Sequence, residues 1–216
     1  MSGGDYGFRE GTGKWPVSYP DTLPPAINVG LGCPTGVKFG TGSNFPAEYR
    51  RALFALDWTF GRILAVHLDE RGASFTGGFE IFLRSRPLNV TAISFGRDGA
   101  LYFITDGRKT RSALYRVRYT GNDGKGDSTV TVNHAVEERR SLESLHGKES
   151  ADGVGKAWPG LGGKDRFVRN AARIVLESQP IAEWNAKALS ENEPALHSSR
   201  CWHSRAVAVR QIARRW

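Results

Sequence analysis

One repeated series of strand-like segments constrains the fold of this chain more than any other feature. Three segments recur in the same order after about 50 residues, a period typical of β-propeller blades: residues 35–40 with 91–96, 52–58 with 100–106, and 63–68 with 114–119. Each is rich in β-branched and aromatic residues, and turn dipeptides such as Asp98-Gly99 separate them. A plain hairpin protein would not produce an ordered triple repeat. The pattern predicts an incomplete β-propeller of about two antiparallel four-stranded blades within residues 34–120, with 75–83 as the fourth strand of the first.

The second strand of each copy is apolar on both faces, which is typical of a strand packed between neighbouring blades. Two blades cannot close a propeller, so an apolar blade face and unpaired strand edges stay open. We therefore expect missing blades, or a partner, to cover the open face. The chain alone is expected to be marginally stable or prone to aggregation.

Helical periodicity replaces the strand pattern after a polar linker at residues 121–136. Within 137–195, one short amphipathic helix is predicted around Leu142 and Leu145. A second begins at the N-cap Asp165, and a third follows Pro180. The apolar stripes of these two helices consist of Val168, Ala171, Ala172, Val175 and Leu176, and of Ile181, Trp184, Ala188 and Leu189. Two short helices joined by a proline-containing turn predict one HEAT-type repeat, which needs neighbours to bury its face.

The two ends of the chain carry neither pattern. Residues 1–33 are rich in glycine and Xaa-Pro pairs and are predicted to form a loop segment of the propeller. Residues 196–216 form a divergent basic tail, of the kind that a shifted reading frame would produce. No signal peptide and no apolar run of membrane-spanning length is found, so the chain as written is expected in the cytoplasm, without a membrane span.

The net charge of +8 raises the question of nucleic-acid binding. Lysine and arginine are spread along the whole chain and do not alternate with aromatic residues in a stacking pattern. We therefore expect no specific nucleic-acid partner. The two cysteines, Cys33 and Cys201, are too far apart in sequence for a zinc motif or a disulfide framework, and the five histidines are scattered.

Basic residues in two loops between predicted strands are the candidate ligand-binding residues, because propellers place ligand contacts in such loops. They are Arg84, Arg86, Arg108, Lys109 and Arg111, and together they could bind an anionic ligand. The alternative is a set of solvated loop charges. Asp57-Trp58 and Asp106 occupy the same place in the two copies, which favours turn capping over catalysis. Since no catalytic or metal-binding motif occurs, no catalytic residue and no metal ligand are assigned.

Several short motifs resemble the glucose/sorbosone dehydrogenase-like β-propellers. They are Gly4-Asp5-Tyr6-Gly7-Phe8-Arg9, Gly11-Thr12-Gly13-Lys14-Trp15-Pro16, Asp57-Trp58-Thr59-Phe60-Gly61-Arg62-Ile63, Asp98-Gly99-Ala100-Leu101-Tyr102-Phe103 and Leu114-Tyr115-Arg116-Val117. With Leu145-His146-Gly147, Ala157-Trp158-Pro159 and residues 165–173, the whole order resembles the PVC-type haem-binding, or membrane-bound dehydrogenase-like, family.

That resemblance implies an exported, periplasmic parent in which a six-bladed propeller precedes HEAT repeats and a cytochrome c module. The parent would oxidise sugars or alcohols, with haem c, pyrroloquinoline quinone and calcium as cofactors. This chain has no CxxCH motif and lacks the first blades, so we expect it to be an inactive segment without a cofactor of its own. The alternative is a non-catalytic propeller and HEAT module that binds a carbohydrate or a protein.

Overall fold

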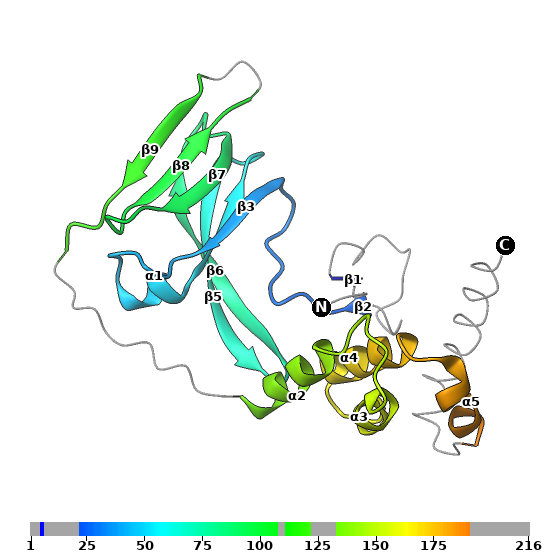
Figure 1. Ribbon diagram of the computed structural model, residues 1–216. Helices are drawn as coiled ribbons and strands as arrows, with labels where there is room; N and C mark the ends of the chain where they lie inside the picture. The colour runs from blue at the N-terminus through cyan, green and yellow to red at the C-terminus, as the bar shows by residue number, and fades with distance from the viewer. Residues whose placement is uncertain (1–4, 7–21, 108–110, 122–132, 191–216) are drawn as a thin grey trace. The chain divides into compact units, whose positions relative to one another are not determined.

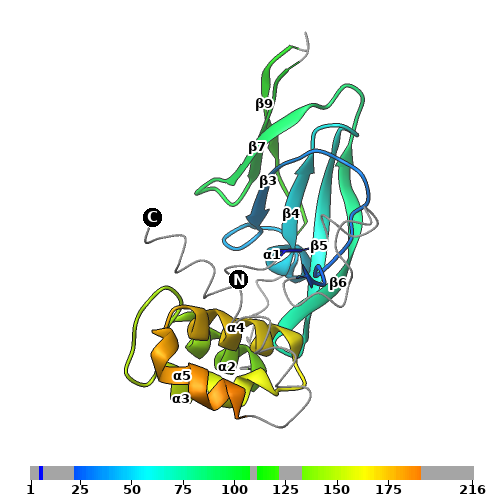
Figure 2. The same cartoon turned by 90° about the vertical axis from the view of Figure 1, so that its right-hand side faces the viewer.

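The computed structural model describes residues 5–6, 22–107, 111–121 and 133–190, and the chain divides into two compact units. The sheet unit comprises Ala26–Glu70 and Phe75–Thr131. The helical unit comprises Met1–Pro25, Arg71–Ser74 and Val132–Trp216. Figures 1 and 2 show the elements of each unit.

Two antiparallel sheets form the sheet unit. The first sheet contains β3 (Pro34–Phe39), β4 (Leu53–Asp57), β5 (Arg62–Arg71) and β6 (Ser74–Arg84) in chain order, and helix α1 (Ala47–Arg51) lies in the β3–β4 connection. The second sheet contains β7 (Val90–Phe95), β8 (Leu101–Thr105) and β9 (Ala113–Val117). All seven predicted strands are therefore present. A fourth strand of the second sheet does not occur among the described residues.

Strand register confirms the repeat found in the sequence. Phe39 lies opposite Leu53 and Leu53 opposite Val66 in the first sheet, while Phe95 lies opposite Leu101 and Leu101 opposite Val117 in the second. These are the residues that the sequence alignment of the two copies equates. The same irregularity also recurs, because the register shifts between Pro34 and Gly36 and again between Val90 and Ala92. The second sheet thus repeats the first down to its bulge.

The two faces of each sheet have different partners. Because side chains alternate along a strand, the register defines a front face and a rear face. The front face carries Val37, Phe39, Leu53 and Ala55 in the first sheet and Ile93, Phe95, Leu101 and Phe103 in the second. The rear face carries Gly36, Phe54, Leu56 and Ile63 in the first sheet and Ala92, Tyr102, Ile104 and Leu114 in the second.

The front face of the second sheet packs on the rear face of the first. The Phe54 and Phe95 rings lie 5.4 Å apart between centroids in an edge-to-face contact. A Cβ added at Gly36 would lie 4.0 Å from Cγ2 of Ile93, so β3 and β7 approach closely there. The Thr35 hydroxyl donates a 2.6 Å hydrogen bond to the Val90 carbonyl. The buried core of the unit lies between these two faces.

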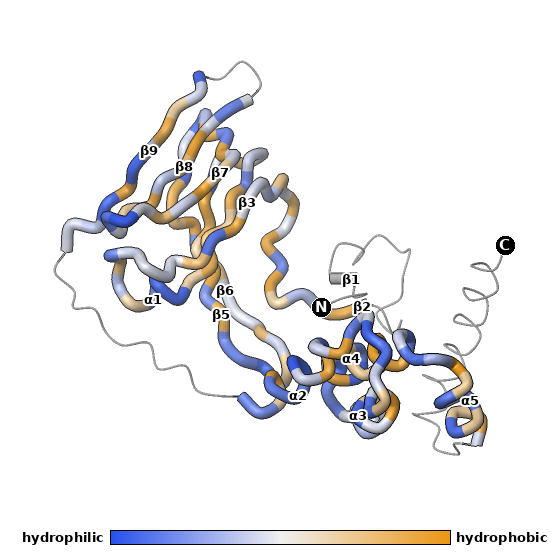
Figure 3. Tube along the Cα trace, in the orientation of Figure 1, coloured by the Kyte–Doolittle hydropathy of each residue, from blue (hydrophilic) through white to orange (hydrophobic). Residues whose placement is uncertain are grey.

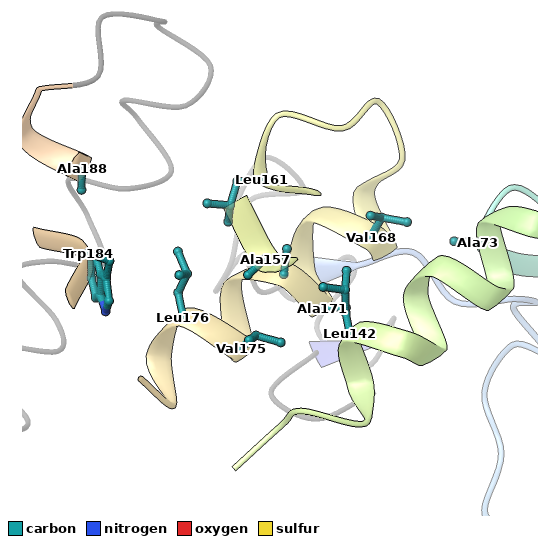
Figure 4. Close-up of a cluster of buried hydrophobic side chains, with 11 residues drawn as sticks. Ala73, Leu142, Ala157, Leu161, Val168, Ala171, Val175, Leu176, Trp184 and Ala188 are labelled. Carbon is teal, nitrogen blue, oxygen red and sulfur yellow. The ribbon is translucent and has the colours of Figure 1, made fainter. Parts of the chain in front are cut away.

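Four helices of the helical unit surround a second core: α2 (His134–Glu143), α3 (Gly153–Leu161), α4 (Arg166–Glu177) and α5 (Ile181–Leu189). Helix α4 packs most closely against α2 and α3. Figure 4 shows this core, with Ala73 at one end and Trp184 and Ala188 at the other. Hydrophobic and hydrophilic positions alternate along the helices in Figure 3, as amphipathic helices require.

The helix predictions were correct for α2, α4 and α5, and Asp165 is the N-cap of α4 as predicted. Helix α3 was not predicted, because its glycines and Pro159 lower local helix propensity. Leu189 was wrongly assigned to the apolar face of α5, since its side chain is exposed. The sequence predicted that α4 and α5 form one HEAT-type repeat. Since α4 packs most closely against α2 and α3, this repeat stays a proposal.

Within the segment predicted to be a loop at residues 1–33, two short strands occur. β1 (Asp5–Tyr6) pairs in parallel with β2 (Thr22–Leu23), and Leu23 is fully buried. A two-residue pairing has no periodicity, so no sequence pattern could indicate it.

The turn between β5 and β6 belongs to the helical unit, where two helix caps hold it. The Asp165 carboxylate accepts hydrogen bonds from the backbone of Phe167 at the start of α4 and, at 2.8 Å, from the N–H of Ala73. The Asn133 side chain caps α2 and donates to the Gly72 carbonyl at 3.0 Å. Gly72 has a φ of 55°, and a Cβ there would collide with the Asp165 carboxylate. Each cap therefore stabilises a helix and the turn together.

Replacing Asp165 by alanine removes both roles of the carboxylate. We expect the free energy of unfolding to fall by about 2 kcal/mol, of which about 1 kcal/mol comes from the cap and a similar part from the bond to Ala73. Asp165→Ser keeps an oxygen that can cap α4 but has no second oxygen to accept from the Ala73 N–H. Its free energy of unfolding should therefore fall by roughly half as much. Urea unfolding followed by circular dichroism measures both. A serine variant as stable as the wild type would contradict the role of the Ala73 bond.

Candidate functional site

Three connections meet at one end of the two sheets, which we call the loop end. The β4–β5 turn, the β6–β7 connection and the β8–β9 connection gather there because the strands of each sheet are antiparallel. Hydrogen bonds join them: the Trp58 indole donates to the Asp106 carbonyl at 3.0 Å, and the Asp106 N–H donates to the Asn89 carbonyl at 2.9 Å. The loop end is therefore one connected surface of the sheet unit.

Asp57 is the central acidic group of the loop end. One carboxylate oxygen accepts hydrogen bonds from the N–H groups of Cys33 and Thr59, both at 3.1 Å. The other accepts from Nε of Arg62 at 2.7 Å. An added Cβ at Gly32 would lie only 2.7 Å from this carboxylate, so the backbone approaches it closely. Asp57 thus closes the β4–β5 turn and anchors the segment that leads into β3.

The Asp57 carboxylate is held in its charged form. Burial is the largest single influence and favours the neutral acid, but the hydrogen bonds from Arg62 and from the backbone of Cys33 and Phe60 together outweigh it. The pKa of Asp57 therefore lies below its ordinary value. A buried carboxylate that is committed to four donors is a structural group and not a proton acceptor for catalysis.

Asp106 also caps a turn, although it is not the register counterpart of Asp57. Its carboxylate accepts hydrogen bonds from the Gly107 N–H at 2.7 Å and from the Ser112 hydroxyl at 2.8 Å. Register equates Asp57 with the buried Thr105 and places Asp106 opposite the position of Trp58. The register therefore agrees with the sequence alignment, in which Asp106 is the equivalent of Trp58, and the contacts of both aspartates agree with turn capping.

The predicted basic residues that the structure describes all lie at the loop end with exposed side chains. Arg84 ends β6, Arg86 lies in the β6–β7 connection, and Arg111 precedes β9. Arg108 and Lys109 lie outside the described residues. The topology therefore brings together three guanidinium groups from two separate loops at one end. Anion binding by these residues stays a prediction.

Two polar clusters escaped the sequence analysis. Asp98 accepts hydrogen bonds from the Tyr102 hydroxyl at 2.9 Å and from Arg116 at 2.6 Å, and the pKa of Asp98 is lowered chiefly by the Tyr102 bond. In the other, His67 and Glu80 of the β5–β6 hairpin lie 3.2 Å apart. Tyr49 of α1 joins them, and its pKa is raised chiefly by a hydrogen bond with Glu80. Only the pairing of His67 with Glu80 across the hairpin was predictable from the sequence. The contact of Tyr49 with Glu80 depends on how α1 packs in the tertiary structure.

The described residues contain no cluster of metal-ligating side chains. Among them, no three His, Cys, Asp or Glu side chains converge as metal ligands would. His146 is occupied by the Ala171 carbonyl at 3.0 Å, and His197, His203 and Cys201 lie outside the described part of the chain. Haem c and calcium therefore find no ligand set there, and no chemical step is assigned to either. The contacts of the loop end show that its acidic side chains stabilise turns.

Replacing Asp57 by asparagine is expected to lower the free energy of unfolding by about 1–3 kcal/mol at neutral pH, because Arg62 loses its charged partner. Since the folded pKa lies below the ordinary value of about 3.9, this stabilisation is present above about pH 4 and is lost as the pH falls through the folded pKa. Urea unfolding at several pH values should show the wild type and variant converging in acid.

Asp69→Asn is the matched control, because Asp69 is an exposed residue of β5. It should change the free energy of unfolding by less than about 0.5 kcal/mol. A pH-independent difference between wild type and Asp57→Asn would contradict the charged state of Asp57.

Comparison with known proteins adds no relative. No protein-family model, no curated protein and no solved structure matches this chain. In the part of the chain that the structure describes, no helix has the length and apolar character needed to cross a membrane. Any assignment of function therefore depends on the sheets, the helices and the loop end themselves.

Proposed function

We propose that this chain is a scaffold segment of an exported, dehydrogenase-like β-propeller protein. The observation that carries the proposal is the repeat: two sheets with the same register and the same bulge follow each other and pack front face on rear face. Successive blades of a propeller are related in this way. The motifs quoted from the sequence support the glucose/sorbosone dehydrogenase-like and PVC-type haem-binding families.

The helical unit supports the same proposal. Short amphipathic helices pack around one core, and α4 begins at Asp165 in a segment that resembles the helical region of that family. We take this unit as the start of a HEAT-type array, in which further repeats stack on the first. Sugar or alcohol oxidation, with pyrroloquinoline quinone and calcium, and electron transfer to haem c belong to the remainder of such a protein.

The chain alone should therefore not reduce an electron-acceptor dye with glucose or simple alcohols, even with added pyrroloquinoline quinone and calcium. A longer natural polypeptide that contains this segment within a complete propeller should do so, because it adds the residues that bind the quinone. Dye reduction followed by absorbance tests both. Turnover by the chain alone, or no quinone-dependent turnover by the longer protein, would contradict the proposal.

A second candidate function is a non-catalytic module that binds an anionic carbohydrate. It is favoured by the exposed Arg84, Arg86 and Arg111, which two loops bring to the same end of the sheets. Guanidinium groups bind sulfate and carboxylate groups through paired hydrogen bonds. A sulfated glycan with several such groups would contact both loops at once.

Substituting Arg84, Arg86 and Arg111 by alanine should weaken binding to a sulfated glycan such as heparin at least about tenfold, because several charge-assisted hydrogen bonds are lost. The matched control replaces Arg51, Arg97 and Arg118, which are equally exposed and lie at the opposite end of the sheets. Calorimetry at fixed salt compares them. Equal losses in both triple variants would indicate nonspecific attraction to the net charge and reject the loop-end site.

A further inference from the structure

In the described residues, the two sheets contact each other through different faces: the front face of the second sheet packs on the rear face of the first. Ile93 and Phe95 on the front face of the second sheet contact Gly36 and Phe54 on the rear face of the first. Strand β7 lies against both β3 and β4. The interface is thus directional, since the second sheet uses its front and the first sheet its rear.

Of the two complementary faces that remain, the β3 part of the front face of the first sheet and the rear face of the second sheet are exposed. On the front face of the first sheet, Val37 and Phe39 are 60% and 47% exposed. On the rear face of the second sheet, Ile104 and Leu114 are 42% and 68% exposed. Leu64 and Val66 on the front face of the first sheet are buried, so its free part is β3. That strand is the counterpart of β7, which forms the interface within the chain.

We propose that a second copy of this chain docks head to tail, with the front face of its first sheet on the rear face of the second sheet. The occupant follows from the interface already present. The exposed front face of the first sheet is the repeat equivalent of the front face of the second sheet, which packs on a rear face. The exposed rear face of the second sheet is the repeat equivalent of the rear face of the first sheet, which receives a front face. This inference goes beyond the proposed function and concerns the chain by itself, because neighbouring blades of a complete propeller would cover the same two faces. It depends only on the packing of the sheets.

Register equivalence names the contacts. Phe39 corresponds to Phe95 and Tyr102 to Phe54, so Phe39 of one copy should meet Tyr102 of the next as Phe95 meets Phe54. Val37 corresponds to Ile93, which lies close to Gly36, and Gly36 is paired with Leu56 in the first sheet. The equivalents of Gly36 and Leu56 in the second sheet are Ala92 and Ile104. Val37 should therefore lie over Ala92 and Ile104.

The polar side chains on the receiving face are compatible with burial. Tyr102 and Arg116 replace Phe54 and Ala65 of the first sheet. Both donate to the Asp98 carboxylate, so the positive and negative charges are paired within the face. Covering such paired groups costs less free energy than covering an isolated charge would.

Head-to-tail docking uses two different surfaces, so each copy can bind two others and the assembly closes into a ring or grows as an open chain. Sedimentation equilibrium of the full chain should show concentration-dependent species at whole-number multiples of the monomer mass. Val37→Asp and Ile104→Asp should each weaken self-association at least about tenfold, because a carboxylate would be buried among apolar groups.

Mixing the two variants tests the direction of docking. The Val37→Asp copy keeps an intact rear face and the Ile104→Asp copy an intact front face, so an equimolar mixture should form a 1:1 dimer and nothing larger. Formation of that dimer also shows that both variants are folded. Leu189→Asp is the control, since Leu189 is 64% exposed in the helical unit and should leave association unchanged.

Three results would overturn the proposal. The first is a wild-type chain that stays monomeric across the accessible concentrations. The second is self-association that Val37→Asp and Ile104→Asp weaken no more than Leu189→Asp does. The third is a mixture of the two sheet variants that remains monomeric although the wild type associates, because one intact front face and one intact rear face would then not be sufficient for docking.

Discussion

Packing of one sheet's front face on the next sheet's rear face is the constraint on which the sheet unit depends. The aromatic and aliphatic side chains between the sheets supply the buried core of the unit, and burial of such surface is the dominant favourable term in folding. Because the packing is directional and the two sheets are repeats, it leaves the β3 part of one front face and one rear face exposed in the described part of the chain. The proposed scaffold role and the proposed self-association both follow from this single asymmetry.

The helical unit depends on shared hydrogen bonds as well as on its core. Asp165 and Asn133 each satisfy orphan N–H groups at a helix start and also a backbone group of the Gly72-Ala73 turn. The small side chain of Ala73 then enters the helical core without displacing larger residues. Glycine at position 72 meets two demands at once, a positive φ and a close approach to a carboxylate.

Most acidic groups of the loop end are committed to structure. The carboxylate oxygen atoms of Asp57 and Asp106 accept hydrogen bonds from turn residues and from Arg62. The exposed arginines are therefore the charged groups that can contact a ligand. This division is the reason why we propose recognition of an anion, and not acid–base chemistry, at the loop end. It also agrees with a scaffold segment, whose polar residues mainly position loops.

Strand positions, the repeat and the helices α2, α4 and α5 were predictable from the sequence, because alternation, helical stripes, turn residues and the Asp165 cap are local signals. The basic candidates Arg86 and Arg111 were predictable as loop residues for the same reason, whereas Arg84 is the last residue of β6. Only the tertiary structure decided that α3 forms despite its glycines and proline, and that the Gly72-Ala73 turn binds two helix caps. Only it separated the front faces from the rear faces. Each of these depends on contacts between segments far apart in sequence, whose energies no local pattern records.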